Sequence, residues 1–451
     1  MKIAVAGTGY VGLVTGVCLA ENGNENIMCV DVDEEKVNLM KKGICPIFEE
    51  GLEELMQKNY QKGRIDYTTD YKSAYKDSDV IIIAVGTPEK TDGSANLDAI
   101  KDVAMQITEC ITKDVLVVIK STVPMGTNEK IEKLIKEHLI DKNIRVEIAS
   151  NPEFLSQGTA VKDMLHGYRI VCGVESEWAK EILQEIYKNF DQPILITNRN
   201  SAEMIKYASN DFLALKISFM NDIANLCEIV GADIEEVALG MSYDKRIGNK
   251  FLKAGIGYGG SCFPKDTKAL HWLAQFKGYE LKTVKAAIEV NENQKLKLIK
   301  KAAEYFESFE GKKIAILGLT FKPGTDDIRE APSISNIKYL LEDEADIYAY
   351  DPVGIKNVQK IFGDSIKYSD SIEDVIKDAE ACFIMTEWED VKNFELKKYR
   401  ELMKRPLIFD GRNCYDLVEA KNEGLEYYSL GRAPMNPEIT TVIDNRNKEQ
   451  K

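Results

Sequence analysis

Short apolar runs alternate with amphipathic stretches over the first two hundred residues of the chain. The runs at residues 2–6, 27–32, 80–85, 115–119, 145–149 and 169–172 are predicted to be strands. Strands that alternate with helical stretches are typical of a parallel sheet covered by helices. We therefore expect residues 1–200 to form an α/β domain.

A different pattern begins at Ser201. Apolar residues recur at steps of three and four from Ile205 to Phe219, and neither Gly nor Pro interrupts the chain from Ser201 to Val230. At 1.5 Å per residue this predicts one helix of about 45 Å that ends before Gly231. A helix of this length usually bridges domains or packs against a second subunit.

Strands are expected again near the end of the chain, at residues 313–317, 347–350, 382–385 and 407–409. The expected fold class is therefore α/β, with two Rossmann-like doubly wound parallel-sheet domains joined by a helical region that contains a long central helix. The expected domains are residues 1–200, 201–310 and 311–435, followed by a polar tail at 436–451.

Composition narrows the function classes. The 451 residues are 44% hydrophobic and 29% charged, which excludes collagen-like, disordered and membrane-spanning proteins. A net charge of −15 argues against nucleic acid and anionic membranes as partners. Nine Cys without a Cys-x-x-Cys pair indicate reduced thiols in a cytoplasmic protein, and three His without ligand spacing indicate no metal site.

The segment 7–12 reads Gly-Thr-Gly-Tyr-Val-Gly between a predicted strand and a predicted helix. Gly7 permits a tight turn, Gly9 lets the backbone approach a pyrophosphate, and Gly12 lets the helix pack close to the strand. Asp31 ends the next strand, where it would accept from both ribose hydroxyls and repel a 2′-phosphate, so NAD is favoured over NADP. The alternative is a glycine-rich turn of another α/β protein. Lys36 is either a contact near the adenosine ribose or a solvated helix lysine.

Polar residues follow three further strands of the same predicted sheet. Thr87 and Thr122 could bond the cofactor or a catalytic water, or simply cap the following turn or helix. Glu153 could hold a water or accept a proton, or be an acid that suits a helix start.

The segment 255–267 places four glycines and Tyr258 before Cys262. Backbone N–H groups and Lys265 would favour the thiolate and steady an oxyanion, and Asp266 would lie in the first turn of a helix. The alternative is a structural cysteine in a tight turn. Lys206 and Asn210 share one helix face, where they could stabilise an alkoxide or form part of a solvated face.

Together these segments resemble the UDP-glucose/GDP-mannose dehydrogenase family. The resemblance rests on residues 7–12, on Lys-Ser-Thr-Val-Pro at 120–124, on Asn-Pro-Glu-Phe-Leu at 151–155 and on the segment around Cys262. Lys322 and Arg329 extend it into the last domain. It implies a four-electron oxidation of a sugar C6 alcohol to a carboxylate with two NAD per turnover, and UDP-glucose is the expected substrate.

The resemblance also implies roles for individual residues. Cys262 would be the nucleophile that forms a thiohemiacetal and then a thioester. Lys206 and Asn210 would stabilise the alkoxide and oxyanion, Asp266 and Thr122 would hold the catalytic water, and Glu153 would act in thioester hydrolysis. The base of the first step could be Lys206, or Asp266 through water. The family often has a second acid where this chain has Gln157, so any role of that acid is open.

The binding residues implied by the resemblance form two sets. The cofactor set is Gly7, Gly9, Val11, Gly12, Asp31, Lys36, Thr87, Thr122, Glu153, Lys265 and Arg329. The substrate set is Glu153, Phe154, Leu155, Lys206, Asn210, Arg246, Phe251, Leu252, Lys253, Ala254, Gly255, Gly259, Lys322 and Arg412. Arg246 is expected to reach the substrate of a neighbouring subunit, which implies a homodimer or a larger homo-oligomer.

Two kinds of alternative remain open at this point. Within the family, the substrate could be GDP-mannose or a UDP-N-acetylhexosamine. Lys265 and Asp266 directly after Pro264 resemble the glucose and mannose branches more than the acetamido-sugar branch, and Tyr258 favours glucose. Outside it, the chain could be a non-catalytic NAD-binding regulatory protein. The intact set of Cys262, Lys206 and Asp266 argues against that.

Overall fold

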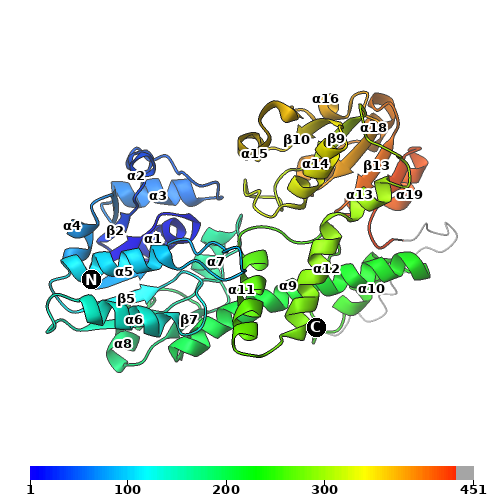
Figure 1. The fold of residues 1–451 in the computed structure, drawn as a ribbon. Coiled ribbons are helices and arrows are strands. Elements are labelled where there is room, and N and C mark those ends of the chain that lie inside the picture. The colour runs from blue at the N-terminus through cyan, green and yellow to red at the C-terminus, as the bar shows by residue number, and fades with distance from the viewer. Residues whose placement is uncertain (433–451) are drawn as a thin grey trace, which may run out of the picture. The chain divides into compact units, whose positions relative to one another are not determined.

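The computed structural model describes residues 1–432, which fall into two compact units (Figure 1). Unit 1 consists of Met1–Asp211 together with Lys265–Leu281. Unit 2 consists of Phe212–Pro264 together with the described chain from Lys282 onward. The predicted tail at 436–451 lies outside the described residues.

Unit 1 is built on a sheet of eight strands that is parallel except at one strand pair. Its elements are, in chain order, β1 (Ile3–Ala6), α1 (Tyr10–Glu21), β2 (Ile27–Val30), α2 (Glu34–Lys41), α3 (Leu52–Gln61), β3 (Ile65–Thr68), α4 (Tyr71–Lys76), β4 (Val80–Ile83), α5 (Asp98–Cys110), β5 (Val115–Ile119), α6 (Thr127–His138), β6 (Val146–Ser150), α7 (Ala160–His166), β7 (Ile170–Gly173), α8 (Glu177–Ile186) and β8 (Ile194–Thr197). The strand order is β3-β2-β1-β4-β5-β6-β7-β8, and only the β6–β7 pair is antiparallel.

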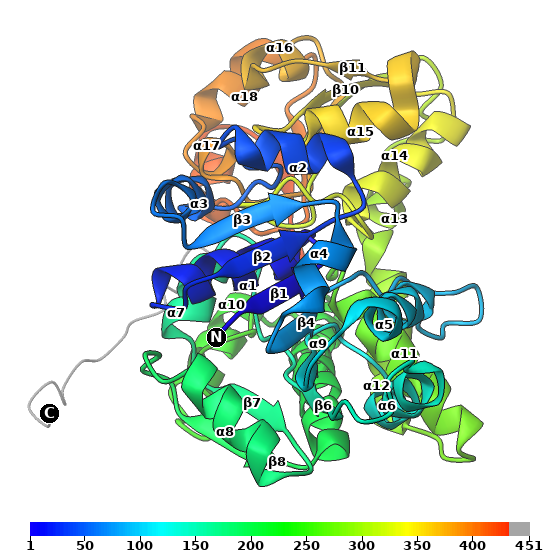
Figure 2. The same cartoon turned by 90° about the vertical axis from the view of Figure 1, so that its left-hand side faces the viewer.

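Both faces of this sheet are buried, which explains why its central strands are continuous apolar runs. Ile3 and Val5 of β1 pack on one face with α1, α3, α7 and α8, whereas Ala4 and Ala6 pack on the other with α4, α5 and α6. Figure 2 shows β3, β2, β1 and β4 side by side in this order. The first six strands have the order of a dinucleotide-binding fold, so their carboxyl ends form the edge where a ligand would bind.

Helix α9 (Arg199–Val230) joins the two units. Its residues up to Asp211 belong to unit 1, and those from Phe212 onward belong to unit 2. It ends where predicted, because Gly231 adopts a φ of +77° that favours glycine. Helix α11 (Phe263–Phe276) begins in unit 2 and continues into unit 1 from Lys265.

Unit 2 contains a second parallel sheet. Its remaining elements are α10 (Ile234–Ser242), α12 (Lys282–Lys295), α13 (Lys297–Ala302), β9 (Lys313–Leu317), α14 (Pro332–Glu342), β10 (Asp346–Tyr350), α15 (Ile355–Phe362), the short 3₁₀ helix Gly363–Ser365, β11 (Lys367–Tyr368), α16 (Ile372–Ile376), β12 (Ala381–Ile384), α17 (Glu389–Lys392), α18 (Leu396–Leu402), β13 (Leu407–Asp410), α19 (Leu417–Asn422) and β14 (Glu426–Tyr428). All strands are parallel, in the order β11-β10-β9-β12-β13-β14.

The second sheet is also covered on both faces. Ile314 and Ile316 pack with α13, α14 and α15, whereas Ala315 and Leu317 pack with α16, α18 and α19. The expected fold class of two doubly wound parallel-sheet domains joined by a long helix is therefore confirmed. Within residues 1–432, no helix combines the length and the apolar character that a membrane span requires.

Candidate active site

The turn between β1 and α1 leaves room for a ligand at the carboxyl end of the first strand. Gly7 has a φ of +92°, and a Cβ on Gly12 would lie 1.9 Å from the carbonyl oxygen of Gly7. Helix α1 can therefore start close to the strand only because Gly12 lacks a side chain. A Cβ on Gly9 would meet no atom within 4 Å. The space beside Gly9 is open, as the approach of a pyrophosphate requires.

Asp31 closes the same site from the end of β2. Its Oδ2 accepts a hydrogen bond from the Thr8 N–H at 2.8 Å, its Oδ1 accepts from the Asp33 N–H at 3.0 Å, and Lys36 Nζ lies 3.8 Å from Oδ2. Burial opposes ionisation, but a hydrogen bond from the Thr8 hydroxyl and these partners outweigh it and hold the pKa of Asp31 below its ordinary value. Asp31 is therefore a carboxylate, with Lys36 beside it.

These features fit a nicotinamide dinucleotide. Val11 lies in the first turn of α1, whose N-terminal N–H groups and dipole favour an anion such as a pyrophosphate. The Asp31 carboxylate is placed to accept from ribose hydroxyls and disfavours a 2′-phosphate. The turn, the open space at Gly9 and the acid together support NAD as the cofactor.

The two predicted threonines lie on neighbouring strand ends and are linked. The Thr87 hydroxyl donates to the backbone carbonyl of Thr122 at 3.0 Å. Thr87 is buried and Thr122 is half-buried. The bond ties together the segments that follow β4 and β5, which confirms only that the two residues share one edge of the sheet.

Lys206 and Glu153 form a buried ion pair in unit 1. Lys206 Nζ lies 2.9 Å from Glu153 Oε1, and the two side chains are only 3% and 6% exposed. Glu153 Oε2 also accepts from the Leu155 N–H. Burial favours the neutral acid, but Lys206, the Leu155 N–H and Lys120 outweigh it and lower the pKa of Glu153. The predicted solvated-face alternative for Lys206 is thus wrong, because its side chain is buried.

A second pair joins α9 to the first turn of α11. Asn210 Nδ2 donates to Asp266 Oδ2 at 2.7 Å, and Lys265 Nζ lies 2.5 Å from Asp266 Oδ1. Asp266 is 1% exposed. Lys206 and Asn210 are one helical turn apart, so α9 presents both to the same buried region of unit 1. Lys265 pairs with the carboxylate of Asp266.

In unit 2, Cys262 lies at the end of a loop whose backbone forms hydrogen bonds with amide side chains. Asn221 Oδ1 accepts from the Gly255 N–H at 2.8 Å, and Gln294 Nε2 donates to the Gly255 carbonyl at 2.8 Å. Asn291 both accepts from the Tyr258 N–H at 2.8 Å and donates to its carbonyl at 3.1 Å. All three amide residues are buried. The loop is therefore fixed before Cys262, which forms no disulfide and is half-buried.

The segment after β9 packs against the same loop. The Gly260 N–H donates to the carbonyl of Arg329 at 2.8 Å, and a Cβ on Gly259 would lie 2.4 Å from the Glu330 carbonyl oxygen. The Arg329 side chain pairs with Asp327, and this pairing is the main cause that raises the pKa of Arg329. The negative charge of Cys262 raises the same pKa further. Arg329 thus contributes positive charge near the sulfur, which favours a thiolate.

Arg412 reaches the loop from the end of β13. Its guanidinium donates to the backbone carbonyls of Met385 at 2.9 Å, Phe321 at 3.2 Å and Gly257 at 3.4 Å. The structure therefore gives Arg412 a role in joining three segments of unit 2. Lys322 lies beside Phe321, with its Nζ 5.6 Å from the ring centroid.

The other predicted substrate residues are spread over both units. Phe154 of unit 1 lies under Arg169, whose guanidinium is 3.8 Å from the ring centroid. In unit 2, Leu252 and Ala254 are buried against α9, whereas Phe251 and Lys253 are exposed. The Arg246 side chain is 89% exposed and pairs with Asp244, and its role toward a second subunit stays a prediction.

Sequence reasoning missed the groups that support these residues. Lys120 is buried and donates to Asn151 Oδ1 at 3.0 Å, and burial lowers its pKa to about 8 although Glu153 opposes this shift. Lys120 stands in the Lys-Ser-Thr-Val-Pro segment, so only its motif pointed to it. Asn221, Asn291 and Gln294 carry no local signal, because single amides on helices resemble ordinary polar surface residues.

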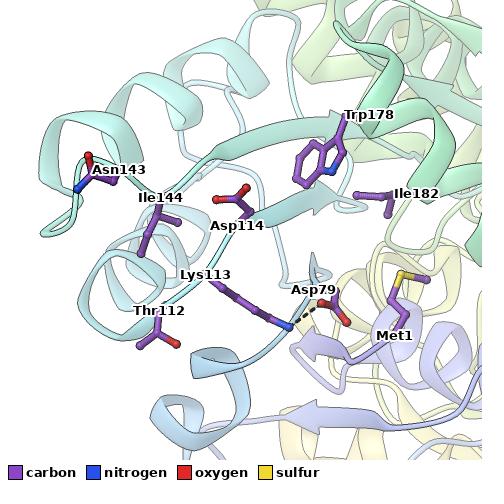
Figure 3. A pocket seen from close by; sticks show the side chains of 9 residues that line it. All are labelled: Met1, Asp79, Thr112, Lys113, Asp114, Asn143, Ile144, Trp178 and Ile182. Carbon is purple, nitrogen blue, oxygen red and sulfur yellow. Dashed lines mark hydrogen bonds and ion pairs between the residues drawn. The ribbon is translucent and has the colours of Figure 1, made fainter.

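A pocket in unit 1 lies away from these groups (Figure 3). Met1, Asp79 and Asp114 precede β1, β4 and β5, so the pocket lies at the amino ends of the strands. Lys113 points to Asp79 across it, with Nζ 2.6 Å from Oδ1. The cofactor features lie at the opposite, carboxyl ends. Among residues 1–432, no three His, Cys, Asp or Glu are grouped to hold a metal ion.

Chemically, the arrangement supplies two sets of functional groups. Unit 1 carries a dinucleotide turn and a buried set of one ammonium, two carboxylates and one amide from Lys206, Glu153, Asp266 and Asn210. Unit 2 carries a half-buried thiol at the end of a fixed, glycine-rich loop. Ammonium and amide donors suit a developing oxyanion, carboxylates suit a water, and a thiol suits covalent capture of a carbonyl.

Comparisons with known proteins identify the family of the chain. Three models of the UDP-glucose/GDP-mannose dehydrogenase family match in order: the NAD binding domain at residues 1–191, the central domain at 200–293 and the UDP binding domain at 315–417. The chain is 52% identical over 437 residues to the UDP-glucose 6-dehydrogenase YwqF of Bacillus subtilis (strain 168), covering 97% of this chain and 99% of that protein.

Solved structures give the same picture. A UDP-glucose dehydrogenase from Pyrobaculum islandicum superposes with a TM-score of 0.88 at 34% identity, covering 95% of this chain and 96% of that one. A UDP-D-ManNAc dehydrogenase from Pyrococcus horikoshii superposes with a TM-score of 0.85 at 27% identity, covering 96% and 100%. From the matched motifs, the fold and these similarities together, the chain belongs to the UDP-glucose/GDP-mannose dehydrogenase family.

Proposed function

We propose that the chain oxidises the C6 hydroxyl of UDP-glucose to a carboxylate, reducing two NAD and consuming one water per sugar. The observation that carries the proposal is the buried set of Lys206, Glu153, Asn210 and Asp266 in a chain whose Cys262 directly precedes α11. Relatives named as UDP-glucose dehydrogenases at 34% and 52% identity support the sugar. NAD, when bound, accepts the hydride in both oxidations.

In the first oxidation the C6 hydroxyl loses a proton and a hydride. The Lys206 ammonium and the Asn210 amide would donate to the oxygen as negative charge develops on it. Because Glu153 is held as a carboxylate, Lys206 keeps a counterion when no substrate is present. The proton acceptor is either a neutral Lys206 amine, which takes the proton and then donates as the ammonium, or Asp266 through a water held with Thr122.

The second oxidation needs covalent capture, because a free aldehyde could diffuse away. The Cys262 thiolate would add to the aldehyde carbon to form a thiohemiacetal, and loss of a second hydride would leave a thioester. Attack by water would then break the carbon–sulfur bond, release the carboxylate and return the thiolate. Asp266, Glu153 and Thr122 are the groups we assign to that water.

Substrate binding is assigned to two cations and to a set of neighbouring and loop residues. The cations of Lys322 and Arg412 would offset the pyrophosphate charge of about −2. The remaining assigned residues are Phe154, Leu155, Arg246, Phe251, Leu252, Lys253, Ala254, Gly255 and Gly259. Cofactor contacts are assigned to the residues of the β1 turn together with Asp31, Lys36, Thr87, Lys265 and Arg329.

An exposed apolar stripe on α9 supports a homodimer. Phe212, Phe219 and Leu226 recur at intervals of seven residues and are 62%, 50% and 51% exposed, and Ile229 is 81% exposed. Apolar residues exposed in one row on a helix indicate an interface. We assign this stripe to contact with a second copy, to which Arg246 would also contribute.

The cysteines indicate the cellular compartment of the enzyme, and the product indicates its biosynthetic use. All nine cysteines lie outside disulfides, which agrees with a reducing compartment, and we place the enzyme in the cytoplasm. UDP-glucuronate is an activated sugar acid, so its formation suits the supply of polysaccharide biosynthesis.

The test is a panel of nucleotide sugars with NAD, followed by absorbance of NADH. UDP-glucose should give the highest kcat/KM, by at least about tenfold over GDP-mannose and UDP-N-acetylmannosamine. Preference for either of those sugars would replace UDP-glucose as substrate, and absence of NADH with every sugar would favour the regulatory alternative. Cys262→Ser should stop steady turnover, whereas Cys110→Ser, on α5, should retain it.

A further inference from the structure

The buried face of α9 in unit 1 carries an acid that the proposed mechanism does not use. Asp211 follows Asn210 and lies one turn beyond Tyr207, so it shares a face with this tyrosine. Asp211 is 4% exposed, and within residues 1–432 neither of its carboxyl oxygens has a hydrogen-bond partner. The neighbouring acid Asp266 has two partners, Lys265 and Asn210.

The charged and titratable groups that face Asp211 come from two helices. Asp266 and Lys265 act on it from α11, and the Tyr207 hydroxyl lies near it on α9. Tyr207 is 1% exposed and its hydroxyl also lacks a partner within the described chain. Burial and the charge of Asp266 raise the pKa of Asp211 to about 8, although Lys265 opposes the shift. An isolated buried carboxylate without donors is costly, so the neutral acid is the stable form at pH 7.

We propose that Asp211 is a positioning residue of the water site, which stays neutral beside Asp266 and thereby keeps a single negative charge there. This inference rests on the role proposed above for Asp266. Loss of the Asp211 proton to solvent would place two like charges in one buried region. That second charge would oppose the oxyanion and the anionic sugar nucleotide.

The first experiment compares Asp211→Asn with the unchanged enzyme from pH 6.5 to 9.5, recording kcat and KM for UDP-glucose. Asparagine keeps the shape and cannot ionise. The ratio of kcat values, variant over unchanged, should be near one at pH 7 and reach about ten at pH 9, one unit above the apparent pKa. The titration of Lys120 is common to both enzymes and cancels in the ratio. Asp222→Asn, at an exposed position of α9, should give a flat ratio.

Two kinetic outcomes would overturn the inference: a ratio for Asp211→Asn that stays flat with pH, or a loss of more than tenfold in kcat at pH 7. The second would mean that the acid itself, rather than its neutrality, is required. If no nucleotide sugar gives NADH with the unchanged enzyme, the proposed function fails, and thermal unfolding still tests the protonation state of Asp211.

The sign of that stability effect follows from the two pKa values. An aspartate with a folded pKa near 8 and an ordinary unfolded pKa near 3.8 costs stability above pH 4, and the cost disappears below it. Asp211→Asn should therefore raise Tm at pH 7, by an amount that shrinks as pH falls toward 4. A lower Tm at pH 7 would mean that Asp211 is an ionised, stabilised carboxylate and would overturn the inference.

Discussion

The two sheets of the molecule share one topology but use it differently. In each, six strands follow the order 3-2-1-4-5-6 counted within the unit. In each, a glycine with φ near +90° follows the first strand: Gly7 at +92° and Gly318 at +90°. The backbone bonds correspond as well, because Gly7 N–H donates to Val30 and Gly318 N–H donates to Tyr350.

An aspartate follows the second strand in both sheets, and here the two diverge. Asp31 is half-buried and accepts from the Thr8 N–H, the Thr8 hydroxyl and the Asp33 N–H, which leaves about one of its four lone-pair sites for a ribose. Asp351 is 1% exposed, and its oxygens accept from the N–H groups of Leu319 at 2.7 Å, Gly354 at 2.6 Å and the Trp388 indole at 3.0 Å. Donors of its own unit therefore fill the hydrogen-bonding capacity of Asp351, which makes it a structural residue.

The connection after the first strand differs too. Helix α1 begins at Tyr10, soon after β1 ends at Ala6, whereas α14 begins only at Pro332, long after β9 ends at Leu317. The longer connection contains Phe321, Arg329 and Glu330, which contact the thiol loop. The comparison teaches that strand order selects the edge that binds a ligand, while the connection and the aspartate decide which ligand.

Removal of Asp351 should give the largest effect on stability. Asp351→Ala leaves several buried N–H donors without an acceptor, so we expect a loss of about 4 kcal/mol in the free energy of unfolding. Urea unfolding measures this loss, and Asp364→Ala at an exposed position is the control. NAD affinity of the folded fraction should not change. A loss below about 1 kcal/mol would mean that the two aspartates do not differ as described.

Substitutions at Gly12 and Gly9 test two different roles of the same turn. Gly12 allows the helix to pack close to the strand, whereas Gly9 leaves space for the ligand. Gly12→Ala places a Cβ against the Gly7 carbonyl and should cost about 2 kcal/mol of stability. Gly9→Ala points into open space at a φ of −67°, so stability should change little while NAD binding weakens. Thermal unfolding and calorimetric titration with NAD distinguish the two. Equal stability losses would contradict the open space assigned to Gly9.

Asp31 should matter for the cofactor more than for the fold. Asp31→Ala removes the acceptor for the ribose hydroxyls, so we expect NAD to bind about tenfold more weakly, or ~1.4 kcal/mol. The repulsion of a 2′-phosphate also disappears, so the preference for NAD over NADP should narrow. Kinetics with both cofactors measure the ratio, and an unchanged preference would remove Asp31 from the ribose site.

The smallest expected effect is on acid stability. Burial opposes the charge of Asp31, but its hydrogen bonds and Lys36 lower its folded pKa below the ordinary 3.8. This stabilisation is present above pH 4 and is lost as pH falls through the folded pKa. The Tm of the unchanged enzyme should exceed that of Asp31→Asn at pH 6, and the gap should close near pH 3. A gap that widens on acidification would reverse the assigned direction.

Most of the fold could be predicted because the central strands are buried on both faces. Residues 80–85 and 115–119 are continuous apolar runs, and β4 and β5 form within them. The prediction missed β3, where exposed Asp66 interrupts the apolar pattern, and β8, where Leu195 is 47% exposed. Both are edge strands of the sheet, where one-sided burial leaves no continuous run.

The site could be predicted where chemistry and spacing coincide. Lys206 and Asn210, one turn apart, indicated a shared face, and Asp266 lies in the first helical turn as predicted. The partners of these residues depend on contacts between distant segments. Nothing near Asn291 in the sequence indicates that it holds the backbone of Tyr258, and nothing near Asp211 indicates that Asp266 is its neighbour.

In the proposed mechanism one chain carries out both oxidations while Cys262 holds the intermediate. The most direct measurement is the number of NADH formed per UDP-glucose when the sugar is limiting and NAD is in excess, with an aldehyde trap present. We predict two NADH per sugar, UDP-glucuronate as product and no trapped aldehyde. One NADH per sugar with the aldehyde recovered in the trap would contradict the account.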